Sequence, residues 1–382
     1  MDDRQIARIV EQVVARLGTD TPKGPAVLRH GRGSGDVATD GRGVHHSVDA
    51  AAAAAKQAFL ALDEISLADR KRYIAALRAT TARELETISR LAVDETGLGR
   101  YTDKLAKNRL VLEKTPGVEA LQPTAWTGDD GLTLMEQAPY GVIGSITPCT
   151  NPTETILNNG IGMLAAGNAV VFNTHPNAKG VSAYFIDKLN AAIEGEGGPS
   201  NVFNCVAHPT IDTAGQLMKH ADIRLLVVTG GGGVVKAAMT CGKRAIAAGP
   251  GNPPVVVDET ADIAQAGRDV VFGASLDNNI ICIVEKEIIA VADIADALKR
   301  ELKANHAVEV RGGDLRRLEK LLITPDNHVN RDYIGKDAAV ILADAGIRVP
   351  ESTRLAYAEV DEGHPFVQHE MLMPVLGFVR AP

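Results

Sequence analysis

Short apolar runs recur from Tyr140 onward, and most of them are followed by a polar loop and then by a segment with helical spacing. The runs are GVIGSI, NAVVFN, NVFNCVA, RLLVVT, RAIAAG and PPVVVD. Strands buried on both faces of a parallel sheet have continuous apolar sequences of this kind. Their alternation with helices predicts an α/β fold with a parallel sheet that helices cover on both faces.

Residues 47 to 112 have the spacing of helices, in Ala-rich and Arg/Glu/Leu-rich segments that Gly97-Leu98-Gly99 interrupts. We therefore expect a mainly helical region ahead of the sheet. Residues 124 to 138 differ, because Gly128-Asp129-Asp130-Gly131 separates Trp126 from the run LTLMEQ. Turn residues between two strand-like segments predict a hairpin arm.

Beyond the last apolar run, the spacing predicts helices over 261–276 and 295–304, and the chain ends with a loop and a strand in HPFVQHEMLMPVLGFVR. A chain of 382 residues is too long for one simple core. We therefore expect two domains, at residues 44–256 and 257–382.

The first residues of the chain predict a separate amphipathic helix over residues 1–18. Its apolar positions are Ile6, Ile9, Val10, Val13, Val14 and Leu17, which share one helical stripe. Residues 19–43 are rich in Gly, Pro, Arg, Ser and Asp and indicate a flexible linker. A tethered helix of this kind suits a docking role in another protein's groove, and folding back onto its own core is the alternative. Its polar face has no strong basic excess and its apolar face no aromatic anchor, so a membrane surface is a poorer partner.

Composition and charge narrow the class of protein. A formal net charge of −8 argues against nucleic acid as the main partner. No apolar run is long enough to span a membrane, and no segment resembles a secretory signal. The 4 cysteines form no CxxC pair and accompany no His cluster with metal spacing. We expect a cytosolic protein with free thiols, without a metal and without a membrane partner.

A run of glycines follows the strand RLLVV, at Thr229-Gly230-Gly231-Gly232-Gly233. Bare backbone at the start of a helix allows close approach of anionic oxygens, so a pyrophosphate is the candidate ligand. The run is not the GxGxxG fingerprint, because Val235 stands at its last position. A flexible glycine turn without a ligand is the alternative. Parallel strands would bring this loop to one sheet edge with the loops at 147–152 and 173–178.

Cys282 lies in the stretch SLDNNIICIVEKE, after a polar turn at Asp277-Asn278-Asn279 and before what we expect to be a charged strand. Taken alone, this cysteine is either a small packing residue or a nucleophile. Reactivity needs a stabilised thiolate and access, and neither is visible in the sequence.

Several segments in a fixed order resemble the aldehyde dehydrogenase superfamily. They are TPCTNPTETI, VVFNTHPNAKG, TGGGG, AGPGNPPVVV, DNNIICIVEKE and HEMLMPVL. Within that superfamily the chain looks most like CoA-acylating aldehyde dehydrogenases, above all the propionaldehyde dehydrogenases of propanediol-utilising bacterial microcompartments. The resemblance runs from about residue 45 to the end, and the front helix with its linker is similar to the encapsulation peptides of those enzymes.

The resemblance implies an architecture and a location. The fold would be aldehyde dehydrogenase-like, with a Rossmann-like domain for NAD and coenzyme A at 44–256 and an α/β catalytic thiol domain at 257–382. The hairpin at 124–138 would be an oligomerisation arm in a homo-dimer or tetramer. Residues 1–18 would dock to shell proteins in the lumen of a microcompartment in the bacterial cytoplasm.

The resemblance also implies roles for individual residues. Cys282 would attack the aldehyde carbonyl, and the oxyanion would be held by the Cys282 backbone N–H and a side chain of Asn151 or Thr150. Hydrolytic members carry a glutamate in the segment matching Ala248–Gly251, where this chain has no carboxylate. Coenzyme A would therefore collect the acyl group. The residues expected to bind NAD are Thr147, Pro148, His175, Thr229, Gly230, Gly231, Gly232 and Glu370.

The reaction implied is a short aldehyde, with propionaldehyde favoured over acetaldehyde, plus NAD+ and CoA to acyl-CoA and NADH. A hydrolytic aldehyde dehydrogenase, a phosphate-dependent reductase of the same fold and a non-catalytic scaffold remain alternatives. Family members continue past the position of Pro382, so we expect the catalytic domain to be C-terminally incomplete here. On that expectation, 1–382 alone would be less active or less well assembled than a longer form.

Overall fold

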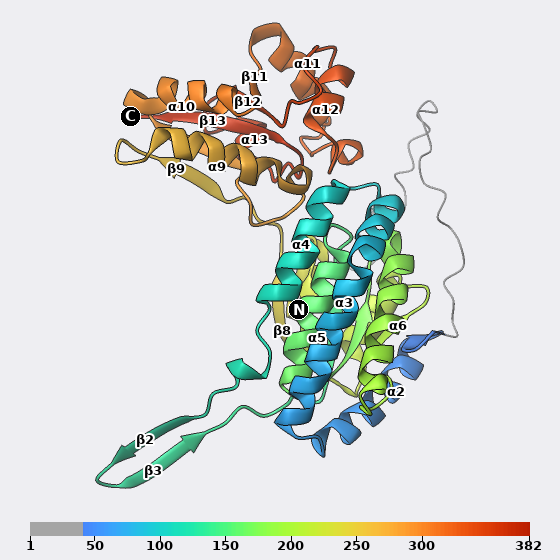
Figure 1. The fold of residues 1–382 in the computed structure, drawn as a ribbon. Coiled ribbons are helices and arrows are strands. Elements are labelled where there is room, and N and C mark those ends of the chain that lie inside the picture. Colours follow the sequence, from blue (N-terminus) through green and yellow to red (C-terminus); the bar gives the residue numbers. More distant parts are fainter. Residues whose placement is uncertain (1–40) are drawn as a thin grey trace.

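The computed structural model describes residues 41–382, and it contains two α/β units, each built on its own parallel sheet (Figure 1). The expected docking helix at 1–18 and the linker up to residue 40 lie outside the described residues. The expected fold class is confirmed. None of the helices in 41–382 combines the length and apolar content that a membrane span requires.

The first unit is built on a six-stranded sheet in the order β1-β6-β5-β4-β7-β8, in which every neighbouring pair is parallel. The strands are β1 (Val44–His45), β4 (Val142–Ile146), β5 (Ala169–Asn173), β6 (Phe203–Val206), β7 (Ile223–Thr229) and β8 (Arg244–Ala248). The apolar runs from GVIGSI to RAIAAG therefore form strands as predicted. Strand β4 lies between β5 and β7, which matters for the site because it brings their ends together.

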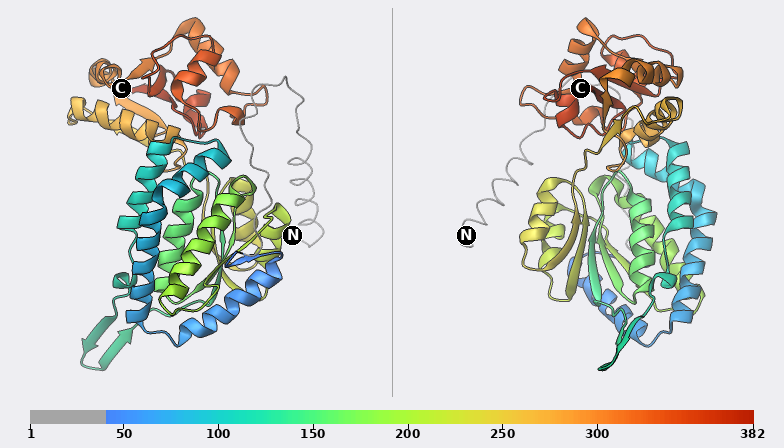
Figure 2. Two further views of the ribbon diagram at one scale, coloured as in Figure 1. Left: turned by 45° about the vertical axis from the view of Figure 1, so that its right-hand side comes forward. Right: turned by 90° about the vertical axis from the view of Figure 1, so that its left-hand side faces the viewer.

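The helices of the first unit cover both faces of this sheet. They are α2 (Val48–Asp63), α3 (Leu67–Thr96), α4 (Tyr101–Lys114), α5 (Pro152–Ala165), α6 (Lys179–Gly195), α7 (Ile211–Lys219) and α8 (Gly232–Thr240). Helices α3, α5 and α6 pack against one another on one face, and α8 lies on the other (Figure 2). Helix α3 ends at Thr96, and its C-cap Gly97 has a left-handed backbone (φ 67°) at the expected interruption.

The second unit has a five-stranded parallel sheet in the order β11-β12-β13-β10-β9. Its strands are β9 (Pro254–Val257), β10 (Glu287–Val291), β11 (Ala307–Glu309), β12 (Leu355–Glu359) and β13 (Val375–Ala381). Its helices are α9 (Ile263–Ser275), α10 (Ala292–Ala304), α11 (Gly312–Leu322), α12 (Ala338–Asp344) and α13 (Pro365–Gln368). Buried apolar side chains such as Leu298, Tyr357 and Phe378 form its core.

The chain passes from the first sheet to the second between Ala248 and Pro254, a few residues before the expected boundary at 256/257. The run PPVVVD was expected to extend the first pattern, and that was wrong, because β9 pairs with β10 of the second sheet. An apolar run indicates a buried strand but not its partner, since strand pairing is decided by contacts distant in sequence.

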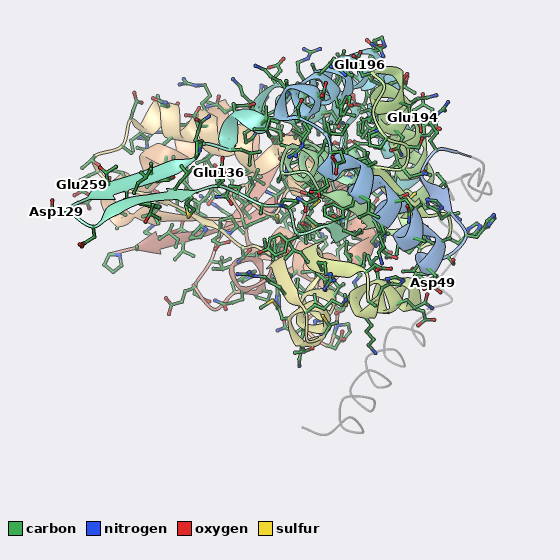
Figure 3. The ribbon with its side chains drawn as sticks, turned by 90° about the horizontal axis from the view of Figure 1, so that it is seen from below. Asp49, Asp129, Glu136, Glu194, Glu196 and Glu259 are labelled. Atoms are coloured by element: carbon green, nitrogen blue, oxygen red, sulfur yellow. The ribbon has the colours of Figure 1, made fainter. Side chains whose placement is uncertain are left out.

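The expected hairpin consists of β2 (Thr124–Gly128) and β3 (Gly131–Met135), paired antiparallel so that Gly128 is opposite Gly131. All residues of both strands are exposed, and the ribbon projects from the first unit (Figure 1). Figure 3 shows Asp129 at its tip and Glu136 nearer its base. Trp126, Leu132 and Leu134 are 53%, 68% and 59% exposed, so the ribbon presents apolar surface.

Candidate active site

Three loops of the first unit leave the same edge of its sheet. Strand β4 is parallel to both β5 and β7, and their carboxyl ends are in register, with Ile146 opposite Asn173 and Val228. The loops at 147–152, 173–178 and 229–233 therefore start side by side, as the sequence predicted. Ligands of open parallel sheets bind beyond such an edge.

The glycine turn begins where β7 ends at Thr229. Gly231 is the N-cap of α8 and provides no side chain to bond the first N–H groups of the helix. A Cβ atom at Gly231, Gly232 or Gly233 would meet nothing within 4 Å. None of these glycines has a positive φ, so neither packing nor backbone conformation requires glycine here. The turn leaves open space and bare N–H groups beside the edge, which suits an anionic ligand.

The other predicted cofactor residues of the first unit flank this turn. Thr147 follows β4 and is buried, and its Oγ1 has no hydrogen-bond partner among the described residues. Pro148 comes next and is half-buried. His175 is half-buried after β5, and its Nδ1 accepts a hydrogen bond from the Asn177 backbone N–H at 3.1 Å. Burial lowers the pKa of His175, which favours the neutral ring near pH 7.

The polar turn before Cys282 is present. Asp277, Asn278 and Asn279 are all buried and have left-handed backbones, with φ of 49°, 55° and 64°. Asparagine and aspartate tolerate this conformation better than other residues with a Cβ atom. We expected a charged strand directly after Cys282, and the predicted start of that strand was wrong. Strand β10 begins only at Glu287, so Cys282 belongs to a loop.

Asn279 and Lys286 hold the two ends of this Cys282 loop together. Asn279 Nδ2 donates to the carbonyl oxygens of Ala274 at 2.7 Å and Glu285 at 2.9 Å. The buried Lys286 Nζ donates to the Asn279 carbonyl oxygen at 2.6 Å and to its Oδ1 at 2.5 Å. Burial lowers the pKa of Lys286 to about 8, although Glu370 and Cys282 act in the opposite direction. A cationic group near a cysteine stabilises its thiolate.

Gly251 and Glu370 lie against the Cys282 loop. A Cβ atom at Gly251 would come within 2.4 Å of the Cys282 carbonyl oxygen, so the two backbones are in direct contact. The Gly251 backbone N–H donates to Glu370 Oε1 at 3.2 Å. Burial raises the pKa of Glu370, more than the Gly251 hydrogen bond and Lys286 lower it. The AGPGNPP segment, the Cys282 loop and the HEMLMPVL loop therefore meet in one place.

Two lysines that the sequence interpretation missed join the first unit to the Cys282 loop. Lys104 Nζ donates to the Thr150 carbonyl oxygen at 2.5 Å and lies 3.0 Å from Asp277 Oδ2. Lys107 Nζ donates to Asn151 Oδ1 at 2.5 Å and lies 2.5 Å from Asp277 Oδ2. The side chains of Lys104 and Asp277 are 0% exposed. No hydrogen bond within residues 41–382 joins Cys282 to Asn151 directly, and Lys107 instead joins Asn151 to Asp277. The Arg100 backbone N–H and the Asp103 carboxylate of the first unit also bond to Asp277.

This buried cluster contains a second acid, Glu154, whose Oε1 lies 3.2 Å from Lys107 Nζ. Burial would lower the pKa of Lys107, but Glu154 and Asp277 outweigh it and raise the pKa. Burial would raise the pKa of Asp277, but Lys107 and Lys104 outweigh it and hold the pKa below its usual range. We therefore take Lys107 and Asp277 as ionised. Two lysines spaced by three on a helix are typical of a solvated face, which is why the pattern gave no signal.

Comparisons with known proteins identify relatives of this chain. The model of the aldehyde dehydrogenase family matches residues 35–326. Acetaldehyde dehydrogenase (acetylating) of Escherichia coli K12 is 45% identical, over 100% of this chain and 80% of its own length. Propanal dehydrogenase (CoA-propanoylating) of Salmonella typhimurium LT2 is 42% identical, over 90% of this chain and 74% of its own.

Solved structures of the same class of enzyme are also similar to this chain. A propionaldehyde dehydrogenase from the Clostridium phytofermentans fucose utilisation bacterial microcompartment has a TM-score of 0.86 and 46% identity, covering 89% of this chain and 78% of that one. The propionaldehyde dehydrogenase of Rhodopseudomonas palustris, solved with bound CoA and an acylated cysteine, has a TM-score of 0.87 and 48% identity with the same coverage.

Proposed function

Because the chain belongs to the aldehyde dehydrogenase family, and is a CoA-acylating member that oxidises short aldehydes to acyl-CoA, we propose that Cys282 carries the acyl group between the aldehyde and coenzyme A. One observation carries this assignment. Cys282 lies in a loop closed by Asn279 and the buried ammonium group of Lys286, and its backbone contacts Gly251, which has no side chain.

The proposed chemistry is covalent catalysis in two halves. The Cys282 thiolate adds to the aldehyde carbon, and the carbonyl electrons move onto the oxygen, which the Cys282 N–H and the Thr150–Asn151 pair hold. NAD+, when bound, accepts the hydride that leaves this carbon. The resulting Cys282 thioester is then attacked by the thiol of coenzyme A as substrate, which loses its proton, and the Cys282 thiolate is released. Because one thioester replaces another, the second half is close to isoenergetic.

The cofactor residues are proposed from the same geometry. Thr147, Pro148 and His175, the Thr229–Gly232 turn and Glu370 would hold NAD, with its pyrophosphate at the glycine turn. The bare turn and the unpartnered Thr147 hydroxyl support this fit. In this scheme the first unit binds the nucleotides and the second supplies the thiol. His175 is proposed to lie at the adenosine ribose, because the resemblance puts it in the usual lysine place of that loop. A neutral ring there adds no full charge for the extra phosphate that NADP carries on this ribose, so we propose NAD as the preferred cofactor.

The preferred aldehyde is proposed to be propionaldehyde, and the names of the relatives include both acetaldehyde and propanal. The test is NADH formation over a panel of short aldehydes, with and without CoA, using the Cys282→Ala variant as control. We expect CoA-dependent NADH and acyl-CoA from the native protein and none from the variant.

A hydrolytic reaction is the second candidate, because the Glu370 carboxylate bonds to Gly251 beside Cys282 and its pKa is raised. A carboxylate there could act as a base toward water. Product analysis separates the two reactions. Free acid formed catalytically in the absence of CoA would contradict the acyl-transfer proposal, and a protein forming no NADH under either condition would support the scaffold alternative.

Two interactions complete the proposal. Residues 1–18 would dock to microcompartment shell proteins, as the likeness to a microcompartment enzyme supports. Fusing residues 1–18 to a fluorescent protein tests this in cells that build shells, and a diffuse signal would count against it. The exposed apolar ribbon of β2 and β3 would join copies of this chain in a homo-oligomer.

A further inference from the structure

Resting on this proposed function, we propose that the Thr150 hydroxyl is the side-chain donor to the aldehyde oxygen, and that Lys107 is a positioning residue that acts on Thr150 through Asn151. The proposal rests on hydrogen bonds that pass from α4 through Asn151 to Thr150, and on ion pairs that join the same lysine to the Cys282 loop.

Asn151 gives the first indication, because it is the N-cap of α5 and yet makes no capping hydrogen bond. Asparagine is among the best N-cap residues, and its side chain normally accepts from the first N–H groups of the helix. Here the side chain is used elsewhere. Its Oδ1 accepts from Lys107 Nζ at 2.5 Å, and its Nδ2 donates to Thr150 Oγ1 at 3.1 Å. Asn151 therefore does not stabilise the start of α5 as a cap, and both polar atoms of its amide make other contacts.

Lys107 fixes the direction of this hydrogen-bond chain. An ammonium group only donates, so the amide oxygen of Asn151 must face Lys107 and the amide nitrogen must face Thr150. The Thr150 hydroxyl is therefore an acceptor from Asn151, and its own proton is free to be donated. Within the described residues the hydroxyl proton has no acceptor of its own.

The same cluster sets where Thr150 lies relative to Cys282. Lys104 Nζ joins the Thr150 carbonyl oxygen to Asp277, and Lys107 Nζ joins Asn151 to the same Asp277 oxygen. Asp277 begins the left-handed turn that leads into Cys282. Contacts of this kind are strong where water is excluded.

The energetics support a positioning role. Burying Lys107 and its carboxylate partners costs desolvation free energy that well-packed apolar side chains would not incur. A charge cluster is therefore a weak source of stability, but it fixes geometry. In this cluster Lys107 faces both Glu154 and Asp277, and Lys104 faces Asp277. Burial and the neighbouring Lys107 lower the pKa of Lys104.

In the reaction, the thiolate of Cys282 forms a bond to the carbonyl carbon and the π electrons move to the oxygen. Thr150 donates a hydrogen bond to that oxygen without transferring its proton. The hydrogen bond strengthens as negative charge develops, so it favours the transition state over the bound aldehyde.

The first experiment compares Thr150→Val, which keeps the shape but removes the hydroxyl, with Thr150→Ser, which keeps the hydroxyl. Loss of one oxyanion donor typically lowers kcat by about 10²–10³, so we expect that loss for Thr150→Val. Thr150→Ser should stay within about tenfold of the native rate. Equal activity of the two variants would overturn the assignment of Thr150. The proposed function would still be supported in that case if the native protein forms NADH in a CoA-dependent reaction.

The second experiment tests Lys107. The double variant Lys107→Met/Glu154→Gln removes the lysine together with one of its two carboxylate partners, and it leaves Lys104 in place 3.0 Å from Asp277. Compared with Glu154→Gln alone, it should lower kcat by about 10–100-fold with little change in KM, because misplacement of a reacting group acts on kcat. An unchanged kcat would overturn the role of Lys107.

Alkylation of Cys282 by iodoacetamide separates positioning of Thr150 from damage to the thiol loop, since this reaction forms no oxyanion. We expect native alkylation rates in Thr150→Val and in the double variant. A rate that falls in parallel with kcat would show that Lys107 acts on the Cys282 loop instead, and would overturn the proposal. A native protein that alkylates normally but forms no CoA-dependent NADH would instead contradict the proposed function itself.

Discussion

Gly251 lies so close to Cys282 that a Cβ atom at residue 251 would come within 2.4 Å of the Cys282 carbonyl oxygen. The atom in the way belongs to the backbone, which cannot move aside as the end of a flexible side chain can. The contact therefore fixes the Cys282 loop and also keeps any larger residue out of that position.

Gly251→Ala is expected to displace the Cys282 loop. We expect at least tenfold slower NADH formation and a loss of about 1–3 kcal/mol in the free energy of unfolding, as for other overpacked sites. Urea denaturation and the NADH assay measure the two effects. Gly249→Ala is the matched control, because its added Cβ would make only an ordinary contact, 3.7 Å from Val235. Native-like activity of Gly251→Ala would contradict the tight packing.

Lys286 should change how the free energy of unfolding depends on pH. Its pKa is lowered from 10.5 to about 8 in the folded protein. Between these values the unfolded chain binds the proton and the folded chain does not, so stability rises with pH across this window. Below about pH 8 Lys286 is protonated in both states. Its buried ammonium group then lowers the free energy of unfolding by about 3 kcal/mol, which is the amount that this pKa shift corresponds to.

The measurement is the free energy of unfolding at pH 8 and pH 10, in the native protein and in Lys286→Met. Subtracting the two proteins removes the contribution of other groups that titrate in this range. We expect the native protein to gain stability relative to the variant as pH rises. A difference that stays constant would mean that Lys286 has an ordinary pKa.

The ribbon of β2 and β3 should control assembly. Leu132 and Leu134 lie on the same face of the ribbon and are largely exposed. Changing both to lysine would place charges on a surface proposed to be buried between copies, so the molar mass from light scattering should fall toward that of one chain. Thr133→Lys, on the opposite face, is the comparison variant. An unchanged molar mass for the double variant would show that the ribbon is not part of the interface between copies.

His175 should influence the choice between NAD and NADP. Replacing the neutral ring with a lysine adds a positive charge, and a charge-assisted hydrogen bond to a phosphate contributes about 1.5–3 kcal/mol. We expect His175→Lys to raise kcat/KM for NADP+ relative to NAD+ by about tenfold. His328→Lys, at an exposed histidine of the second unit, adds the same charge elsewhere. An equal shift in both variants would point to net charge rather than to a contact.

Strands β4 to β8 of the first sheet could be predicted because each is a local apolar run, whereas the two-residue strand β1 has no such run and was missed. The turn at Asp277-Asn278-Asn279 could be predicted from its polar residues, but its left-handed backbone was not. The partner of β9 could not be predicted, because pairing joins residues that are distant in sequence. Lys104 and Lys107 were missed for a related reason. Their burial depends on Asp277, which follows them by a long stretch of chain and gives the helix no local sign of its partner.

The described chain crosses from one sheet to the other only once, at residues 249–253, and this crossing includes the glycine that contacts Cys282. The same five residues therefore join the two sheets and set the position of the Cys282 backbone, so a change made to the joint is also a change made beside the thiol.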